Sequence, residues 1–459
     1  MKLKAAEGKV RKIIGDSLKD VVEPFKKNGF QIYLVGGVVR DIILERKREE
    51  NEYDLTTNAR PFEVKKMFKY VIPTGIKHGT VTVILNNINY EITTFRAEST
   101  YTDGRHPDKI TFSNDIHEDL KRRDFTINGL AFDLINYKLI DDFNGLGDIE
   151  NKIVRTIGKA DERFQEDGLR IMRAIRFATV LNFIIEEKTY RSIKKNLFML
   201  KKVSMERIRD EFVKILKAEK PSKGIEFLRK SEILRYILPE LLTCYGITQN
   251  KYHKYDVYYH ILHTLDATPS NNLPVRLAAL FHDISKPFTK IKSNNSEGED
   301  ATFYNHEVIG AKVARKVMKR LKFSNDMIER VEKLVKFHMF YYTEEWTDSA
   351  VRRFIRKVGL DMLDDLYLLR EADRIGNGLK KGKSRHLEML KKHIEKILEE
   401  ENAFSVKDLK INGNDIMKIK NIPPSPKVGE ILNYLLEIVL ENPEKNTPEE
   451  LKKLVEEYK

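Results

Sequence analysis

Residues 30–57 read FQIYLVGGVVRDIILERKREENEYDLTT and decide the fold of the N-terminal part of the chain. The apolar run Phe30–Val35 predicts a strand, which Gly36-Gly37 ends where a side chain would block close approach. Glu52 and Asp54 are two residues apart, so on a strand both carboxylates project from the same face. Paired carboxylates repel unless a cation lies between them, and a divalent metal is the usual cation. The alternative is a surface turn in a charge-rich linker.

The composition favours a multidomain chain with a polyanionic partner. Its 459 residues predict roughly two to four domains, and 41% hydrophobic with 33% charged residues allow proper cores beneath much solvated surface. The formal net charge of +13 favours nucleic acid before membrane, because lysines and arginines gain by releasing condensed counterions. A lysine-rich composition without such a partner is the alternative.

The cysteine content and the hydropathy pattern indicate a cytoplasmic location. The single cysteine, Cys244, leaves no disulfide within the chain and fits a reducing compartment. The N-terminal segment lacks an apolar stretch and mixes acids with lysines, so we expect no signal peptide. No apolar run approaches the length of a membrane span, so we expect no membrane contact.

We predict an α+β fold with a small α/β head followed by a long, all-helical neck, body and tail. Strand signals are confined to the head, and helical periodicity continues from Lys152 to the end. The expected domains are an N-terminal helix at 1–29, the head at 30–150, the neck at 151–245, the body at 246–400 and the tail at 401–459.

Two segments show these patterns most clearly. A hairpin with a turn at Asn86-Asn87 is predicted for residues 79–95, GTVTVILNNINYEITTF, because apolar and polar residues alternate in both arms. One continuous helix is predicted for residues 161–183, DERFQEDGLRIMRAIRFATVLNF, whose apolar stripe includes Ile171 and Ile175. A loop is predicted for residues 292–302, KSNNSEGEDAT.

Glycines followed by an arginine suit a phosphate site. Gly36-Gly37 would let backbone amides approach phosphate oxygens, and Arg40, one turn into the next helix, would clamp them while Asp41 braces Arg40. A second signal is EDLKRRDFTINGLAFD (118–133), in which Arg122, Arg123 and Asp124 precede a stretch that must bury Phe125 and Ile127. The alternative for this stretch is a helix capped by charged residues.

A third signal is a charged ribbon on the predicted helix at 161–183. Asp167, Arg170, Arg173 and Arg176 are spaced by three, which moves each side chain about 60° around the helix axis. Together with Glu166, they form a slanting ribbon of acids and bases beside the apolar stripe. The alternative is a solvated ladder of salt bridges.

Five motifs occur in an order that resembles one enzyme family. They are LVGGVVRD…EYDLTT, KRRDFTINGLAFD, DDFNGLGDI, ERFQEDGLRIMRAIRF and SMERIRDEFVKIL, between about residues 30 and 216. In this order they are similar to the signature motifs of the class II tRNA nucleotidyltransferase and bacterial poly(A) polymerase family. The resemblance implies a nucleotidyltransferase head on a helical neck, body and tail. It also implies addition of CCA, or part of it, to tRNA 3′ ends without a nucleic-acid template.

The resemblance assigns roles to the charged residues. Glu52 and Asp54 would hold two Mg²⁺ ions, although the family's first carboxylate is typically aspartate and Glu52 is one methylene longer. Gly37, Arg40 and Arg123 would contact the phosphates and sugar of the incoming nucleotide.

Base choice would rest on the charged ribbon. By resemblance, Asp167 and Arg170 read the base edge, and Arg173 and Arg176 would support either this reader or the phosphates. An aspartate accepts from the exocyclic amine of C or A, while an arginine donates to the adjacent ring nitrogen; U and G reverse both polarities. The polar segment 96–112 resembles a flexible loop of CCA- and A-adding members, which argues against addition of CC alone.

A second constellation resembles the HD superfamily of metal-dependent phosphohydrolases. His260, His282-Asp283 and Asp373 would bind a divalent metal, with His306 on a neighbouring segment, because adjacent buried His and Asp both need partners. The alternative is a set of structural remnants without metal. We expect three further histidines, His253, His263 and His338, to be ordinary packing or surface residues.

The leading hypothesis is an enzyme that completes or repairs the CCA end of tRNA using CTP and ATP. An A-only adding enzyme or a poly(A) polymerase is the alternative within the family. An HD phosphodiesterase with an RNA-binding head and a pure RNA-binding protein are alternatives from other classes. The Glu52/Asp54 pair and the Asp167/Arg170 pair argue against the last two, because binding alone requires neither. The oligomeric state is left open.

Overall fold

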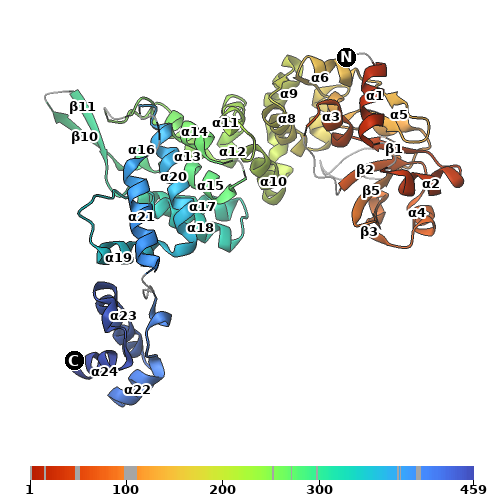
Figure 1. Cartoon of the computed structure of the whole chain (residues 1–459). Coiled ribbons are helices and arrows are strands. Elements are labelled where there is room, and N and C mark those ends of the chain that lie inside the picture. The colour runs from red at the N-terminus through yellow and green to blue at the C-terminus, as the bar shows by residue number, and fades with distance from the viewer. Residues whose placement is uncertain are drawn as a thin grey trace. The chain divides into compact units, whose positions relative to one another are not determined.

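The computed structural model describes residues 3–14, 17–46, 52–97, 111–250, 253–269, 271–295, 298–379, 382, 384–399 and 405–458. The chain divides into two compact units, an N-terminal unit at Met1–Pro239 and a C-terminal unit at Glu240–Lys459 (Figure 1). The N-terminal unit contains a mixed sheet with surrounding helices, and the C-terminal unit is mostly helical. These features confirm the predicted fold class of an α/β head followed by a helical body.

The sheet of the N-terminal unit has seven strands in the order β3-β4-β5-β2-β1-β6-β7. Strands β2 and β5 are parallel, and the other neighbouring strands are antiparallel. The strands are β1 (Ile32–Val35), β2 (Glu52–Thr57), β3 (Val71–Gly75), β4 (Thr80–Leu85), β5 (Ile88–Thr94), β6 (Ala131–Asp133) and β7 (Leu139–Ile140).

Two predictions about this sheet are confirmed. The run before Gly36-Gly37 forms β1, whose four residues are all buried. Strands β4 and β5 form the expected hairpin, in which Asn86 and Asn87 have φ of 53° and 61°. Asparagine tolerates this left-handed conformation, which a tight two-residue hairpin turn requires at both positions.

Helices complete the N-terminal unit. They are α1 (Leu3–Ile14), α2 (Lys19–Lys27), α3 (Gly37–Ile43), α4 (Pro61–Met67), α5 (Ile116–Lys121), α6 (Gly145–Glu150), α7 (Ala160–Glu166), α8 (Leu169–Val180), α9 (Glu187–Lys195), α10 (Met205–Leu216), α11 (Pro221–Lys230) and α12 (Leu234–Ile237). The predicted single helix at 1–29 is therefore wrong, because α1 and α2 are separate helices.

The predicted continuous helix at 161–183 is also wrong, because it breaks between α7 and α8. Asp167 leaves the helical conformation, with φ of −145° and ψ of 107°. A Cβ on Gly168 would lie 2.6 Å from the carbonyl oxygen of Met199, so only glycine permits this close approach. The break moves Asp167 away from the regular ribbon that the spacing implied.

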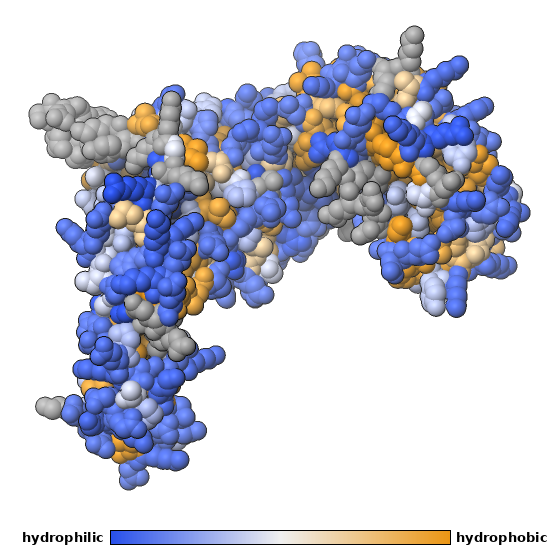
Figure 2. Space-filling view, in the orientation of Figure 1, coloured by the Kyte–Doolittle hydropathy of each residue, from blue (hydrophilic) through white to orange (hydrophobic). Residues whose placement is uncertain are grey.

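The C-terminal unit consists mainly of helices. They are α13 (Pro239–Leu242, across the division), α14 (Val257–Ala267), α15 (Leu273–Phe281), α16 (Lys286–Thr289), α17 (His306–Arg320), α18 (Asn325–Phe337), α19 (Asp348–Val358), α20 (Leu363–Gly376), α21 (Arg385–Glu399), α22 (Gly413–Lys420), α23 (Pro426–Glu441) and α24 (Pro448–Glu457). Among the described residues, no helix combines the length and apolarity needed to cross a membrane. Hydrophilic residues predominate on the visible face of this unit (Figure 2).

The prediction of an all-helical chain after Lys152 is wrong in two places. Strands β10 (Lys290–Asn295) and β11 (Gly298–Phe303) form an antiparallel hairpin where a loop was expected. This polar segment offers no apolar stripe of helical period, so its backbone groups pair across two strands instead. Strands β8 (Ile153–Val154) and β9 (Ile184–Ile185) form a short parallel pair of β-branched residues.

Candidate active site

The turn between β1 and α3 forms one wall of the site. Gly36 has φ of 68°, a conformation that side chains rarely adopt, and a Cβ there would lie 3.3 Å from Arg123 Nη1. Gly37 begins α3, and its Cβ position is 3.3 Å from Arg40 Nη2. Both glycines therefore allow guanidinium groups to approach the backbone closely.

Arg40 is buried and fixed by two partners. Its Nε and Nη2 each donate to an oxygen of Asp41 at 3.0 Å, which confirms the predicted brace, and its Nη1 donates to Asn128 Oδ1 at 2.5 Å. Burial lowers the pKa of Arg40, and the adjacent Asp41 carboxylate opposes that change. The guanidinium is thus preorganised at the floor of the site.

A cavity of about 450 Å³ opens at this turn. It brings together Gly37, Arg40, Asp54, Arg123, Asp167, Arg170, Arg173 and Arg176, all of which the sequence analysis selected. Its lining also includes Gly36, Arg122, Asp124, Asn128, Leu169, Phe177 and Arg207. The arginines outnumber the carboxylates, so the cavity suits a polyanionic ligand such as a nucleoside triphosphate.

A face of acidic side chains borders the cavity. Glu52 and Asp54 lie at alternate positions of β2, so both project from one face of the sheet. Asp54 lines the cavity, whereas Glu52 lies farther along the strand and does not. Asp54 pairs in register with Glu91 of the parallel strand β5, so Glu91 lies on the same face.

The electrostatics of this face fit a bound cation. Burial raises the pKa of Glu91, and the negative charges of Asp54 and Glu52 raise it further. A divalent metal would relieve that repulsion, and carboxylate oxygens are the ligands that Mg²⁺ prefers. Sequence spacing did not identify Glu91, because the parallel β2–β5 pairing that places it there is non-local.

Helix α5 positions the next two arginines. Its residues Ile116 and Leu120 pack in one buried cluster with Tyr33 of β1. Asp119 on the same helix accepts from Arg122 at 2.6 Å and from Arg123 at 3.0 Å. Burial would raise the pKa of Asp119, but the two guanidinium groups lower it to about 2.

Phe177 of α8 lies among three arginines. Arg176 stacks over its ring at 4.0 Å from the centroid, Arg40 at 5.0 Å and Arg173 at 5.4 Å. Such cation–π contacts allow like charges to converge without direct contact. Each of these three arginines also has an acidic partner.

The acidic partners lie on other elements. Arg173 Nε donates to Asp124 at 2.6 Å, and Arg176 Nε lies 2.7 Å from Glu211 of α10. Burial would raise the pKa of Asp124, but Arg173 and the hydrogen bond from Asn128 bring it to about 2. Arg173 and Arg176 therefore act as a braced pair rather than a solvated ladder.

The two residues predicted to read the base have fixed orientations. Asp167 accepts from the backbone N–H of Leu169 at 3.0 Å and from Arg207 Nη2 at 2.9 Å. Arg170 Nη1 donates to Glu166 at 2.5 Å, and its Nη2 donates to the carbonyl oxygen of Arg122 at 3.1 Å. Both side chains line the cavity: Arg170 lies on the first turn of α8, and Asp167 lies two residues before that helix begins.

Several site residues were missed or given no role. Four of them, Asn128, Asp124, Arg207 and Glu211, lie inside motifs that the sequence analysis quoted, and polar or charged side chains next to apolar positions were the available signal. Phe177 carried no polar signal. Most of the loop at 96–112, used to argue against addition of CC alone, lies outside the described residues.

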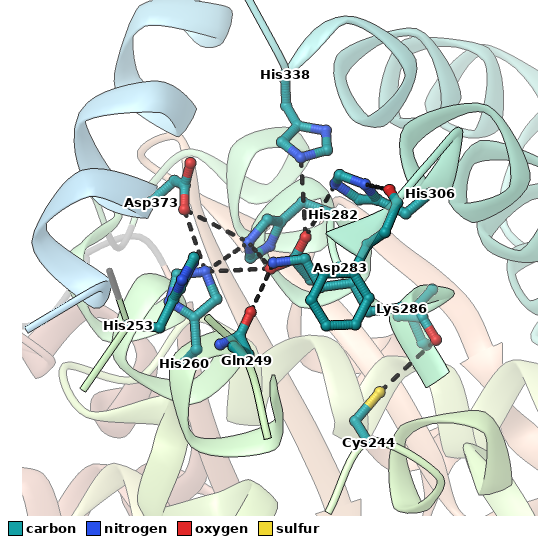
Figure 3. Close-up of polar contacts among 12 residues, drawn as sticks. Cys244, Gln249, His253, His260, His282, Asp283, Lys286, His306, His338 and Asp373 are labelled. Atoms are coloured by element: carbon teal, nitrogen blue, oxygen red, sulfur yellow. Dashed lines mark hydrogen bonds and ion pairs between the residues drawn. The ribbon is translucent and has the colours of Figure 1, made fainter. Parts of the chain in front are cut away.

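A separate polar cluster lies in the C-terminal unit and brings together the predicted metal ligands (Figure 3). His260 Nε2 lies 3.0 Å from His282 Nε2, 3.2 Å from Asp283 Oδ2 and 3.1 Å from Asp373 Oδ1. Burial would lower the pKa of His260, but hydrogen bonds to Asp283 and Asp373 raise it to about 9. The cluster therefore attracts positive charge.

His338 also lies in this cluster, so its interpretation as an ordinary packing or surface residue missed its location. It is buried, and its Nε2 lies 3.9 Å from Asp283 Oδ1. Burial lowers the pKa of His338 to about 3, which leaves the imidazole neutral near pH 7. By contrast, His263 is exposed, and the ring of His253 lies against that of His260 at 5.3 Å.

Comparisons with known proteins agree with both units. Residues 32–155 match the family model "Poly A polymerase head domain", and residues 182–244 match "Probable RNA and SrmB- binding site of polymerase A". Residues 301–455 match the model for tRNA nucleotidyltransferase domain 2. Fold and cavity thus define a nucleotidyltransferase.

Relatives that match nearly the whole chain identify the family within the nucleotidyltransferases. The CCA-adding enzyme of Lactobacillus helveticus is 33% identical over 445 residues, covering 95% of this chain and 96% of that protein. The CCA-adding enzyme of Streptococcus thermophilus is 32% identical over 442 residues, covering 96% of each chain. The chain therefore belongs to the family of CCA-adding enzymes, the class II tRNA nucleotidyltransferases.

Solved structures agree with the family. The Bacillus stearothermophilus CCA-adding enzyme in complex with CTP matches with a TM-score of 0.71 and 26% identity, covering 96% of each chain. The Thermotoga maritima CCA-adding enzyme complexed with tRNA shares the fold, with a TM-score of 0.56 and 19% identity over 99% of this chain and 98% of that one.

Proposed function

We propose that this protein adds C and A nucleotides to the 3′ end of tRNA, using CTP and ATP without a nucleic-acid template. The observation that carries the proposal is the cavity beside β2, in which a carboxylate strand, seven arginines and Asp167 converge. A binding module for RNA would need the arginines but not the acidic face. The family relationship favours the same activity.

The arginines bind and orient the triphosphate. Arg40 and Arg123 flank the glycine turn, so they are assigned to the phosphates and sugar of the incoming nucleotide together with the backbone of Gly37. Arg173 and Arg176 approach from α8 and support the same groups. Because each guanidinium is already paired with an acid, little side-chain freedom is lost when the nucleotide binds.

Glu52 and Asp54 are assigned as ligands of Mg²⁺, with Glu91 beside Asp54 on the same face. When bound, the metal would lower the pKa of the RNA 3′-hydroxyl and neutralise the triphosphate and its leaving pyrophosphate. Asp54 lies at the arginine-rich cavity, and Glu52 projects from the same face of β2. A metal held there would lie next to the triphosphate that the arginines bind.

Asp167 and Arg170 are assigned to base selection. The carboxylate accepts from the exocyclic amine of C or A, and the guanidinium donates to the adjacent ring nitrogen. U and G present a carbonyl and a ring N–H at these positions, which would leave two polar groups mispaired in a confined site. Hydrogen-bond polarity, rather than cavity size, would therefore exclude them.

The proposed function assigns a role to each part of the chain. We propose that residues 30–150 form the catalytic head and 151–245 a neck that selects the nucleotide and binds RNA. The body at 246–400 would form an HD-like domain and the tail at 401–459 a separate module, with 1–29 covering the head. A tRNA substrate and one buried thiol, Cys244, favour a cytoplasmic location.

The direct test uses tRNA transcripts that end before CCA, after the first C and after CC, each with labelled CTP or ATP. Addition of two C and then one A supports the proposal. Addition of A alone, only to the transcript ending in CC, would indicate an A-only enzyme, and long A tracts would indicate a poly(A) polymerase. Transfer to none of the transcripts would contradict nucleotidyl transfer to tRNA.

The C-terminal unit favours a second activity. We propose that His260, His282, Asp283 and Asp373 bind a divalent metal in an HD-like phosphohydrolase site, because three buried ligand atoms converge there and Oδ1 of the partly buried Asp373 lies 3.1 Å from His260 Nε2. A cavity of about 530 Å³ adjoins the cluster and is lined by Lys286, Arg370 and Arg374, whose charges suit phosphate. Release of phosphate from model esters should require added metal and should be lost in His282→Ala, while addition to tRNA continues.

A further inference from the structure

One aromatic side chain lies among the cations of the arginine-lined cavity. Phe177 of α8 is only 5% exposed, yet it is part of the cavity wall. The Cζ atoms of three guanidinium groups lie within 5.4 Å of its ring centroid, and they belong to Arg40, Arg173 and Arg176. Binding of phosphate accounts for the cations but not for a ring among them.

A fully buried neighbour fixes the plane of this ring. The rings of Phe177 and Phe125 are nearly perpendicular, with centroids 5.7 Å apart and an interplanar angle of 78°. Such edge-to-face pairs are favourable, because the positive edge of one ring meets the negative face of the other. Phe125 is itself fully buried, so the pair has little freedom to turn. The guanidinium groups therefore meet a ring of fixed orientation.

Attraction to the ring leaves the donors of the guanidinium groups available. A guanidinium group has five N–H donors, and its attraction to an aromatic face requires none of them. Asp124 accepts from Nε of Arg173 at 2.6 Å, and Glu211 lies 2.7 Å from Nε of Arg176. Among the described residues, no protein group accepts a hydrogen bond from Nη1 of either arginine. Those donors remain for phosphate oxygens.

The convergence of these cations is unfavourable by itself. Burial lowers the pKa of Arg176 to about 10, although the Glu211 carboxylate opposes that change. The positive charges of Arg173 and Arg40 lower it further. A further carboxylate would hold the cations together, but its charge would repel the phosphates of a nucleotide. The negative face of an aromatic ring attracts the cations without adding a net charge.

We propose that Phe177 is a positioning residue for the triphosphate, because its ring face holds Arg40, Arg173 and Arg176 together while their remaining donors stay open to phosphate. Its action is electrostatic, so the affinity for a triphosphate depends on the electron density of the ring and not only on the space that the ring fills. This inference rests on the proposed function of the cavity and adds a residue that acts through the arginines.

The test changes the electron density of the ring and nearly keeps its size. Phenylalanine carrying one, three or five ring fluorines is placed at position 177 of the full chain by nonsense suppression. Fluorine withdraws electrons from the ring face, so each step weakens the attraction to the guanidinium groups. Circular dichroism reports that each variant is folded.

Binding of inorganic tripolyphosphate gives the first readout. Calorimetry without Mg²⁺ excludes contributions from a base and from the metal face, and competition with CTP identifies the cavity as the site. We expect the dissociation constant to rise at each step, by about 10-fold over the whole series. Phe177→Leu, which has no aromatic face, should weaken binding by about the same factor, on the order of 10-fold.

The matched control is the same fluorine series at Phe164 of α7. This side chain is fully buried in the same unit, and no cation lies over its ring in the part of the chain that the structure describes. Its variants should bind tripolyphosphate as the unchanged protein does.

Steady-state addition of CTP and ATP to tRNA gives the second readout. The KM for each nucleotide should rise in parallel with the dissociation constant of tripolyphosphate, while kcat changes little. The reason is that the arginines bind the triphosphate in the ground state and in the transition state alike. A fall in kcat at constant KM would contradict the positioning role.

The outcomes distinguish this inference from the proposed function. A dissociation constant that stays constant across the Phe177 series would overturn the inference, because the ring would then only fill space. An equal rise in the Phe164 series would overturn it too, since fluorine would then act through packing. Neither result touches nucleotide addition. A graded rise in a protein that adds no nucleotide to tRNA would support the inference and contradict the proposed function.

Discussion

Arg207 Nη2 donates a hydrogen bond of 2.9 Å to Asp167 Oδ2, so the carboxylate assigned to base recognition is already paired with a cation from α10. The backbone N–H of Leu169 fixes its other oxygen. Arg207 Nη1 also donates to Oδ1 at 3.4 Å, so it is Oδ2 that keeps a second lone pair for the amine of C or A. Arg207 therefore orients the base reader without contacting the base itself.

Removal of Arg207 should weaken base selection more than it weakens chemistry. In Arg207→Ala, Asp167 keeps one backbone hydrogen bond and gains rotational freedom, so we expect about 10-fold to 100-fold lower kcat/KM for CTP and ATP. Relative incorporation of UTP and GTP should rise. Single-turnover addition to tRNA lacking its 3′ end measures both effects.

The matched control is Arg209→Ala, two residues along the same helix. Arg209 pairs with the adjacent Asp210 at 2.8 Å, so its loss removes the same charge without touching Asp167. The ranking of the four nucleotides should stay that of the unchanged protein. Equal effects of both substitutions would assign Arg207 to RNA binding instead.

We expect nucleotide addition to tolerate a shorter side chain at position 52 but not the loss of its negative charge. Glu52→Asp restores the carboxylate usual in the family, so we expect a turnover equal to or higher than that of the unchanged protein. Glu52→Gln and Glu91→Gln should lose activity strongly, because each removes a negative charge from the cation-binding face. Steady-state addition of CTP over a range of Mg²⁺ concentrations measures this. Near-normal rates for both glutamine variants would show that only Asp54 holds the metal.

Asp124 should make the stability of the N-terminal unit depend on acid pH. Its pKa of about 2 lies below the value of about 3.9 in an unfolded chain, so its ionisation stabilises the fold above about pH 4, and this contribution is lost as the pH falls through about 2. Asp124→Asn also leaves Arg173 without its carboxylate, so we expect a loss of about 1–3 kcal/mol near neutral pH.

Calorimetry at several pH values checks this, with the transition of the N-terminal unit identified by its upward shift on adding CTP. The difference between Asp124→Asn and the unchanged protein should narrow between pH 4 and pH 2. A difference that stays constant across that range would contradict the ion pair.

Cys244 provides a probe of the C-terminal unit. The thiol is buried, its Sγ lies 3.6 Å from the carbonyl oxygen of Ile284, and burial raises its pKa. We expect reaction with a thiol reagent to be slower than that of a free thiol by on the order of 100-fold or more, because it requires local opening. One thiol should react at once in guanidinium chloride.

His263→Cys, which adds an exposed thiol on α14, is the control and should supply one fast-reacting group. Rapid labelling of Cys244 in the native protein would contradict its burial and would disqualify it as a reporter of folding.

The local sequence pattern predicted much of the secondary structure of the head, but it did not predict where helices break or where the polar hairpin forms. The β4–β5 hairpin follows from alternation and two asparagines, both of which are local signals. The break at Asp167-Gly168 does not, because it depends on the carbonyl of Met199, more than thirty residues along the chain. The hairpin at 290–303 was also missed, since polar residues carry no periodic apolar stripe.

The site shows the same division between local and non-local information. Arg40, Arg123, Asp167 and Arg170 could be selected from motifs, because each motif carries its own charges. The neighbours of these residues could not be assigned, since Arg207 approaches Asp167 from α10 and Glu91 lies beside Asp54 on a parallel strand. His338 was missed for the same reason: only the packing of several helices brings it to Asp283.

The central claim is that Asp167 and Arg170 choose C and A by hydrogen-bond polarity in the arginine-lined cavity. Single-turnover addition of all four nucleotides to tRNA lacking its 3′ end, by the Asp167→Ala/Arg170→Ala variant, tests it most directly. We predict a strong fall in addition of CTP and ATP, with residual activity from the intact metal face and a rise in the relative incorporation of UTP and GTP. If the variant keeps the original ranking of C and A over U and G, the two residues do not read the base and form only structural ion pairs.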